Sequence, residues 1–327
     1  MHLIADRLPP ETVDSSMRLR RDIRLGPAAL RQKEWWFGYA HDEDARAFVS
    51  WSFVRSMPVD QFRILVVDLA SGEMTHVKRE LTYLEGGGAP APGSSGLSLR
   101  HRGEPSLTYV DVEPDRAQLL VEGLRTGRES VEVDLEIIRI GSPFTRRQHY
   151  GPCSYELLHR FTDRIRGRVR VGNRTLALDT RTTYTDHCFG FVPRTTTWQW
   201  IAACSTERAS EQPVALSVLQ NHGPHAQRYA QVLVDGTWHR LGPVVDVEYD
   251  AANPLLPWRV TSSDLDLEVT VRHAHHDQVR IPPMLPLLVH LRHDEFVVTC
   301  DGTARIGGTL VPLEGLRGVA ELHSGRW

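Results

Sequence analysis

The sequence has few cysteines, and none of them lies near another. Four are present among 327 residues, at positions 153, 188, 204 and 300. The chain has no C-x-x-C pair, so we expect neither a zinc site built on cysteines nor a dithiol redox motif. In a reducing compartment, thiols this far apart should stay reduced and mostly buried.

Long apolar segments are also missing. No stretch approaches the roughly 20 apolar residues that cross a bilayer, and the longest candidate, residues 281–291, contains three prolines. Residues 1–10 hold only a short apolar run and lack the apolar core of a secretory signal. We therefore expect no membrane span and a cytoplasmic protein.

Neither sign of charge dominates. The chain has 38 Lys and Arg against 41 Asp and Glu, a net charge of -3. Nucleic-acid binding usually requires a strong basic excess on one face. The arginines of residues 160–174 are interrupted by Asp163 and by apolar residues, so we interpret them as solvated strand faces. We expect no nucleic-acid partner.

Cofactor signatures are absent as well. The chain has no nucleophile elbow, phosphate-binding loop or dinucleotide fingerprint, and Gly86-Gly87-Gly88 fits none of them. The sequence therefore predicts no cofactor.

What the sequence does contain is short segments of alternating polarity. In residues 131–137, Val131, Val133, Leu135 and Ile137 alternate with acidic residues, and residues 47–55 and 265–271 follow the same pattern. Period-two alternation is typical of strands with one buried face. Further strands are expected at 62–69, 118–122, 167–171, 195–202, 214–219, 231–234 and 296–299. Turns are expected at Asp235-Gly236 and Asp301-Gly302.

Many short strands without helical periodicity predict an all-β chain of barrels or sandwiches with little helix. The length of 327 residues suits about two domains. Residues 85–105, rich in glycine and proline, are expected to form a flexible loop, with a flap over a site as the alternative. Residues 282–286, Pro-Pro-Met-Leu-Pro, are interpreted as a buried connection or a stiff lip of a pocket.

Three sequence blocks stand out. The first is K-E-W-W-F-G-Y-A at residues 33–40, followed by the strand F-V-S-W-S-F-V-R at 48–55. The second runs from R-V-R-V-G-N-R-T at 168–175 through Tyr184 and D-H-C-F-G at 186–190 to T-W-Q-W-I at 197–201. The third is L-R-G-V-A-E-L at 316–322, near the final G-R-W.

In order and spacing, these blocks resemble the AttH / carotenoid 1,2-hydratase superfamily of tandem lipocalin-like proteins, which is related to tocopherol cyclase-like proteins and to lipocalin-like Diels–Alderases. The resemblance covers the chain from about Glu34 to its last residue. Phe37 and Phe189 depart from the pattern, which has tyrosine and tryptophan there. The resemblance implies two tandem antiparallel lipocalin-like barrels. We expect an extension at residues 1–25, one barrel at 26–180 and the other at 181–327.

The adjacent pair Asp186-His187 is the chemically richest feature. In an apolar barrel mouth, desolvation would raise the pKa of the carboxyl group and lower that of the imidazole, which suits acid–base chemistry. Neighbouring strand residues point to opposite faces, so only one of the two needs to face a cavity. The alternative is a structural role that holds the bend at Gly190. The same two readings apply to Glu321, as a catalytic acid or as a structural clamp.

Large aromatic residues are expected to line a substrate site, although core or rim packing is the competing interpretation. The six expected wall residues are Trp36, Tyr39, Trp51, Tyr184, Trp198 and Trp200.

The leading functional hypothesis is a cofactor-independent enzyme that acts on a hydrophobic polyene- or polyketide-derived small molecule in natural-product biosynthesis. It would be a cyclase, hydratase or isomerase with polar roles for Asp186, His187 and Glu321. The alternative is a non-catalytic carrier of a hydrophobic ligand. A third option is metal binding through the cluster of His273, His275, His276 and Asp277, in which His273 and His275 share a strand face. No further ligand is evident on that face, so no metal is predicted.

Overall fold

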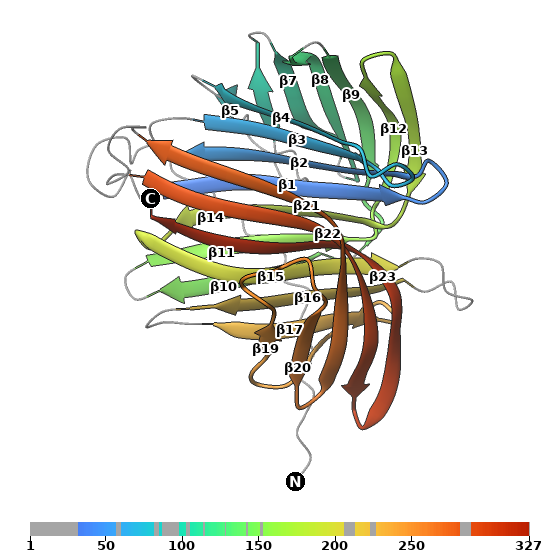
Figure 1. Cartoon of the computed structure of the whole chain (residues 1–327), viewed down its shortest axis with the longest axis vertical. Coiled ribbons are helices and arrows are strands. Elements are labelled where there is room, and N and C mark those ends of the chain that lie inside the picture. Colours follow the sequence, from blue (N-terminus) through green and yellow to red (C-terminus); the bar gives the residue numbers. More distant parts are fainter. Residues whose placement is uncertain are drawn as a thin grey trace. The chain divides into compact units, whose positions relative to one another are not determined.

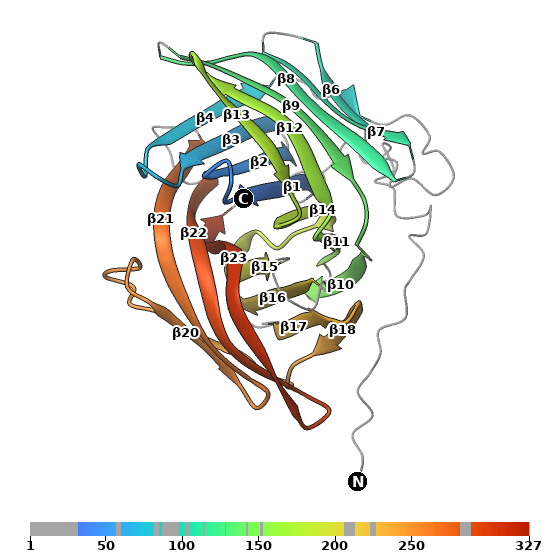
Figure 2. The same cartoon turned by 90° about the vertical axis from the view of Figure 1, so that its right-hand side faces the viewer.

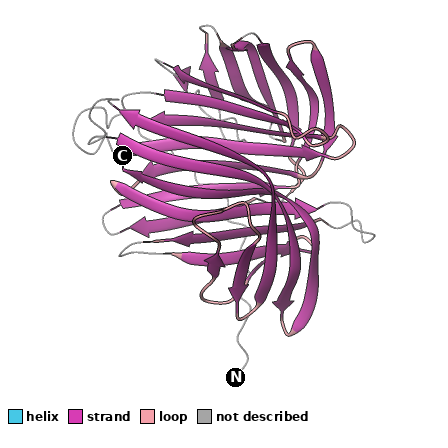
Figure 3. Ribbon diagram, in the orientation of Figure 1, coloured by secondary structure: helices cyan, strands magenta, loops and turns pink. Residues whose placement is uncertain are grey.

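The computed structural model describes residues 32–56, 60–81, 85–86, 98–102, 105–113, 115–127, 129–141, 143–150, 153–205, 213–222, 227–281 and 289–326. Within these ranges the regular structure consists of strands, and no helix occurs (Figure 3). Every described residue of the expected strands lies in a strand except Leu69, which follows the end of β3. The prediction of an all-β chain is confirmed, and the described residues contain no helix capable of crossing a membrane.

The chain forms two compact units. Unit 2 contains residues 12–145 and 157–189, and unit 1 contains residues 1–11, 146–156 and 190–327. The expected extension at residues 1–25 lies outside the described residues, as do most of the 85–105 loop and the proline-rich 282–286 segment. The expected boundary at residues 180 and 181 stays a prediction.

Unit 2 is built on two antiparallel sheets. Sheet A has the strand order β10-β11-β14-β1-β2-β3-β4, and sheet B has the order β13-β12-β9-β8-β7-β6-β5 (Figures 1 and 2). The chain passes between the units within β10, β11 and β14. The strands of sheet A are β1 (Gln32–Asp42), β2 (Ala47–Ser56), β3 (Asp60–Asp68), β4 (Met74–Leu81), β10 (Phe144–Tyr150), β11 (Cys153–Phe161) and β14 (Thr183–Phe191). Those of sheet B are β5 (Glu85–Gly86), β6 (Ser98–His101), β7 (Ser106–Glu113), β8 (Arg116–Thr126), β9 (Glu129–Ile138), β12 (Arg164–Val171) and β13 (Arg174–Thr180).

The core of unit 2 lies between one face of sheet A and one face of sheet B. Every second residue of β9 enters it, as the alternation at 131–137 predicts, and meets Trp36, Trp51 and Phe53 from β1 and β2. Gly38 lies opposite Trp51 in the β1–β2 register, and a Cβ atom at Gly38 would lie 2.5 Å from Cζ2 of Trp51. The missing side chain therefore lets the indole pack flat on β1.

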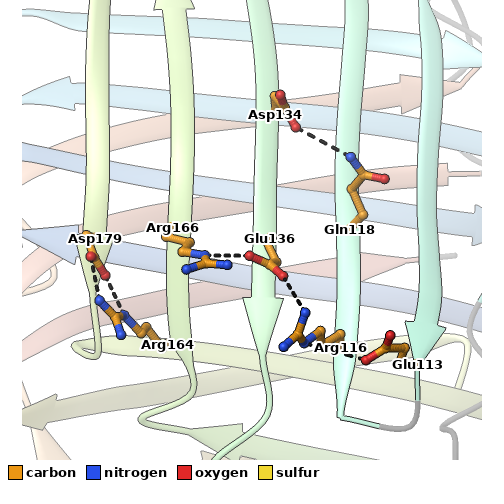
Figure 4. Close-up of polar contacts among 8 residues, drawn as sticks. All are labelled: Glu113, Arg116, Gln118, Asp134, Glu136, Arg164, Arg166 and Asp179. Atoms are coloured by element: carbon orange, nitrogen blue, oxygen red, sulfur yellow. Dashed lines mark hydrogen bonds and ion pairs between the residues drawn. The ribbon is translucent and has the colours of Figure 1, made fainter.

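The other face of sheet B carries ion pairs across neighbouring strands (Figure 4). Arg164 binds both carboxylate oxygens of Asp179 at 2.6 Å, and Arg166 binds Glu136, which also pairs with Arg116. These side chains are exposed or half-exposed, so each pair contributes at most about 1 kcal/mol. The interpretation of the arginine-rich segment as a solvated strand face is confirmed from Arg164 to Arg174, whereas Arg160 is partly buried.

Unit 1 contains the nine-stranded antiparallel sheet C, in the order β18-β17-β16-β15-β23-β22-β21-β20-β19. Its long strands β21 to β23 bend strongly along their length (Figure 2). The strands are β15 (Thr195–Ser205), β16 (Val214–Asn221), β17 (Arg228–Val234), β18 (Thr237–Arg240), β19 (Asp246–Glu248), β20 (Trp258–Ser262), β21 (Leu265–Ile281), β22 (Val289–Ile306) and β23 (Thr309–Arg326). One face of the curled sheet encloses a core that includes Trp258 and Phe296.

The two predicted turns have different outcomes. Asp235 and Gly236 join β17 to β18 with φ angles of 50° and 72°, the left-handed pair that a tight hairpin needs, so this prediction is confirmed. The turn at Asp301-Gly302 is wrong, because both residues lie inside β22. There, β23 carries one extra residue, and Gly315, at φ 60°, donates its N–H to the Asp301 carboxylate at 2.7 Å. The Asp301-Gly302 pair therefore lies opposite a β-bulge of the neighbouring strand and forms no turn.

Candidate active site

Strand β14 directs its neighbouring ionisable residues to opposite faces of sheet A. The Asp186 carboxylate bonds to Tyr184, two residues earlier, while the His187 ring stacks on Trp36 in the unit 2 core. This is the period-two alternation of a pleated strand. The side chains of Asp186 and His187 therefore lie in different surroundings.

The Asp186 carboxylate is held by two donors. The backbone N–H of Phe37 on β1 donates to Oδ1 at 3.2 Å, and the Tyr184 hydroxyl lies 2.9 Å from Oδ2. The same hydroxyl lies 2.5 Å from Nδ1 of His159 on β11. Asp186, Tyr184 and His159 thus form a continuous hydrogen-bonded chain across two neighbouring strands.

Aromatic rings surround this chain. The Tyr184 ring lies 4.6 Å from Phe161, 5.9 Å from Tyr39 and 6.2 Å from Phe37, measured between ring centroids. Phe144 stacks on His159 at 4.3 Å. The structure thus brings together Tyr39, Tyr184 and Asp186 from the expected set.

Burial changes the acidity of Asp186. Desolvation raises its pKa to about 7, although the hydrogen bonds from Tyr184 and from the Phe37 backbone act in the opposite direction. A carboxyl group with this pKa exists in both forms near neutral pH. It can therefore donate a proton and accept one back.

His159 is the member of this chain that the sequence analysis missed. It is fully buried and lies between Leu158 and Arg160, with no neighbouring motif to single it out. The available signal was one histidine on an otherwise apolar strand face, two residues before Phe161. A satisfied core histidine gives the same pattern.

On the other face of sheet A, Nε2 of His187 lies 3.0 Å from the Glu34 carboxylate, and its ring stacks on Trp36 at 4.7 Å. Trp36 and Trp51 are both part of the unit 2 core. The structure therefore places these expected residues away from the Asp186 chain.

The remaining expected residues belong to unit 1. Trp198 donates its indole N–H to Glu321 at 3.3 Å, and His293 lies 3.6 Å from the same carboxylate. Trp198 also stacks on His323 at 3.6 Å, and burial lowers the pKa of His323 to about 3. Trp200 pairs with Glu321 across β15 and β23.

The cluster of His273, His275, His276 and Asp277 lies on β21, within the ranges that the structure describes. No three His, Cys, Asp or Glu side chains in those ranges are arranged to hold a metal ion. His276, a member of this cluster, instead binds Asp294 at 2.8 Å.

Comparisons with known proteins identify the fold. A protein of Nitrosomonas europaea described as a candidate AttH superposes with a TM-score of 0.60 at 15% identity, over 89% of this chain and 92% of that one. Kievitone hydratase from Nectria haematococca superposes with a TM-score of 0.60 at 13% identity, over 92% of this chain and 90% of that one. The predicted AttH-like, lipocalin-like fold is confirmed.

Sequence comparison gives one match. The protein-family model described as "Domain of unknown function (DUF2804)" covers residues 17–327. No protein with curated annotation matches the chain.

Proposed function

The chain belongs to the DUF2804 family, and from this premise we propose that it is a cofactor-independent enzyme that adds water to an unsaturated, hydrophobic small molecule, with Asp186 as the general acid. One observation carries the proposal. Asp186, with a pKa of about 7, is hydrogen-bonded to Tyr184 and through it to His159.

The proposed reaction balances around this carboxyl group. Protonated Asp186 transfers its proton to one carbon of a double bond, so a C–H bond forms as the π bond breaks. Water then bonds to the neighbouring cationic carbon, and one of its protons passes to the Asp186 carboxylate. The acid is restored, and the net change is the addition of one water molecule.

The other two polar groups support the charge changes. When Asp186 is ionised, the Tyr184 hydroxyl donates to it and His159 Nδ1–H donates to Tyr184. When Asp186 is protonated, each hydrogen bond can reverse direction, because a hydroxyl and a neutral imidazole both donate and accept. Proton transfer by such a placed group contributes about 10²–10⁴-fold to a rate.

The surroundings suit an apolar substrate. Phe37, Tyr39, Phe144 and Phe161 supply ring faces around the acid, and rings of this kind hold a hydrophobic chain by burial. One solved protein with this fold is named as a hydratase. This likeness in fold supports the reaction class and does not specify the substrate.

The test uses an apolar extract of the producing cells, incubated with the purified protein in water labelled with heavy oxygen. We expect mass spectrometry to show a compound that gains one labelled water molecule. Asp186→Asn should lower its formation by at least about 10²-fold, because the amide cannot donate an acidic proton.

Asp134→Asn, an exposed change on the outer face of sheet B, is the control and should leave the rate unchanged. Circular dichroism should show the same strand content for all three proteins. Full activity of Asp186→Asn would overturn the proposal. Saturable binding from the same extract without a labelled product would favour the carrier.

A further inference from the structure

The face of sheet C that points away from the unit 1 core is unusual, because it is buried and yet partly polar. Residues 201 and 203 of β15 enter the core, whereas Trp198, Trp200 and Ala202 lie on the other face. Glu295, Glu321 and His323 lie on that same face and are buried too. Burying polar groups costs free energy unless they gain hydrogen bonds, so each one needs a partner.

Two neighbouring side chains on this face have unsatisfied atoms. Ser217 on β16 pairs in register with Gln231 on β17 and with Ala202 on β15. Ser217 is 0% exposed and Gln231 is 4% exposed. The Ser217 hydroxyl and the Gln231 amide oxygen are buried without a hydrogen-bond partner, and they do not bond to each other.

The surroundings of this pair carry charges of both signs. Glu321 lies opposite Trp200, which lies opposite Leu219 on β16. Tyr229, two residues before Gln231, lies under the Arg146 guanidinium at 3.5 Å. The face around the pair thus carries aromatic rings, the Glu321 carboxylate and the Arg146 guanidinium. Such an environment does not favour a ligand of either charge.

We propose that Ser217 and Gln231 form a binding site for a hydroxyl group of an uncharged, aromatic or hydrophobic ligand. A hydroxyl group both donates and accepts, so it can donate to the Gln231 oxygen and accept from the Ser217 hydroxyl. It would bind equally well with the Gln231 amide rotated, because it would then accept from the amide NH₂. This site lies within unit 1 and does not depend on the proposed hydration.

The probe pair is naphthol and its methyl ether, which share a ring system but differ in the hydroxyl donor. Binding to the whole protein is followed by titration calorimetry. We expect naphthol to bind about three- to tenfold more tightly than the ether, the value of one neutral hydrogen bond. Ser217→Ala and Gln231→Met should each remove most of this preference while leaving the affinity for the ether unchanged.

Gln220→Met is the matched control, because the Gln220 oxygen already accepts the backbone N–H of Val247 at 2.7 Å. We expect Gln220→Met to lower the urea midpoint of unfolding and to keep the naphthol preference, whereas Gln231→Met should not lower the midpoint. A wild-type protein that binds both probes equally, or does not bind naphthol, would overturn the proposal, and equal binding is also the result expected if only a water occupies the pair. An equal loss of stability in Gln231→Met and Gln220→Met would assign Gln231 a purely structural role.

Discussion

The Tyr184 hydroxyl stabilises the charged form of Asp186, since its hydrogen bond lowers the pKa that burial raises. Removing it in Tyr184→Phe should therefore raise the pKa of Asp186 further. A general acid works only while protonated, so activity should fall as the pH rises through about 7. In Tyr184→Phe the rate should be lower, and the decline of activity with rising pH (the falling limb of the pH profile) should shift to a higher pH by about one unit. Profiles of kcat/KM against pH measure both effects.

His187→Gln separates this effect from a general disturbance of β14. His187 contacts Glu34 and Trp36 on the other face of the strand, so its replacement should not move the limb. A limb that stays in place in Tyr184→Phe, or that moves equally in both variants, would contradict the assignment.

At this scale the sequence predicted part of the site. The Asp186-His187 pair was found from residue types, and the rule of alternation indicated that only one of the two needs to face a cavity. Which one does so depends on Phe37 N–H and Tyr184, which approach Asp186 through strand pairing. His159 could not be predicted, because its partner Tyr184 is 25 residues away in the chain and no local pattern connects the two.

Strand β1 depends on Gly38 for its packing. A Cβ atom there would lie 2.5 Å from Cζ2 and 2.7 Å from Cε2 of Trp51, so the indole would have to move. Overpacking of this kind costs about 1–3 kcal/mol. Gly38→Ala should therefore lower the free energy of unfolding by that amount in urea titrations. The same change should cost less in a Trp51→Leu background, where the ring is gone. Equal costs in both backgrounds would show that the ring is not the obstacle.

The strands were predictable because each buries one alternating face, as residues 131–137 do in β9. The wrong turn at Asp301-Gly302 has a specific cause. A sequence pair that often forms a hairpin also fits opposite a bulge, and only the pairing with Gly315 distinguishes the two. The long strands β21 and β22 were likewise predicted only in pieces, and β23 was not predicted as a strand. Bulges interrupt the alternation of these strands.

Over the whole chain, two buried ionisable groups give the units opposite responses to pH. The pKa of Asp186 in unit 2 rises from 3.8 to about 7, so folded unit 2 binds more protons than the unfolded chain between these values. Its stability therefore falls as the pH rises across this window. The pKa of His323 in unit 1 drops from 6.5 to about 3. There the unfolded chain binds more protons, so stability rises with pH up to about 6.5.

As the pH rises from 5 to 6.5, His323 should stabilise unit 1 and Asp186 should destabilise unit 2. Each effect should amount to at most about 1.4 kcal/mol per pH unit. Hydrogen exchange read by mass spectrometry can follow the strands of each unit separately. Asp186→Asn should weaken the response of unit 2 alone, to which the raised pKa of buried Asp163 also contributes, and His323→Phe should weaken that of unit 1 alone. A response that changes in the unit without the substitution would contradict this account.

Over the whole molecule, the sequence did not predict that sheets A and C are buried on both faces. Alternation predicted one buried face per strand. In these sheets the second face is buried as well, with Tyr39 and Tyr184 on sheet A and Ser217 and Glu321 on sheet C. Polar side chains on that second face looked like solvated positions in the sequence, which is why Ser217 and Gln231 gave no signal.

The bulge at Gly315 has a consequence for how this chain can change over generations. Leu313 and Leu316 both enter the core of unit 1 although they are three positions apart. In a regular pleat, residues three apart point to opposite faces. Loss of the single codon for Gly315 would leave Leu313 and Leu316 two positions apart, so a regular pleat would keep both in the core and only the bulge would disappear. Loss of one residue at this bulge should therefore be tolerated far better than loss of one residue in a regular part of β23, where the side chains on one side of the deletion would change faces.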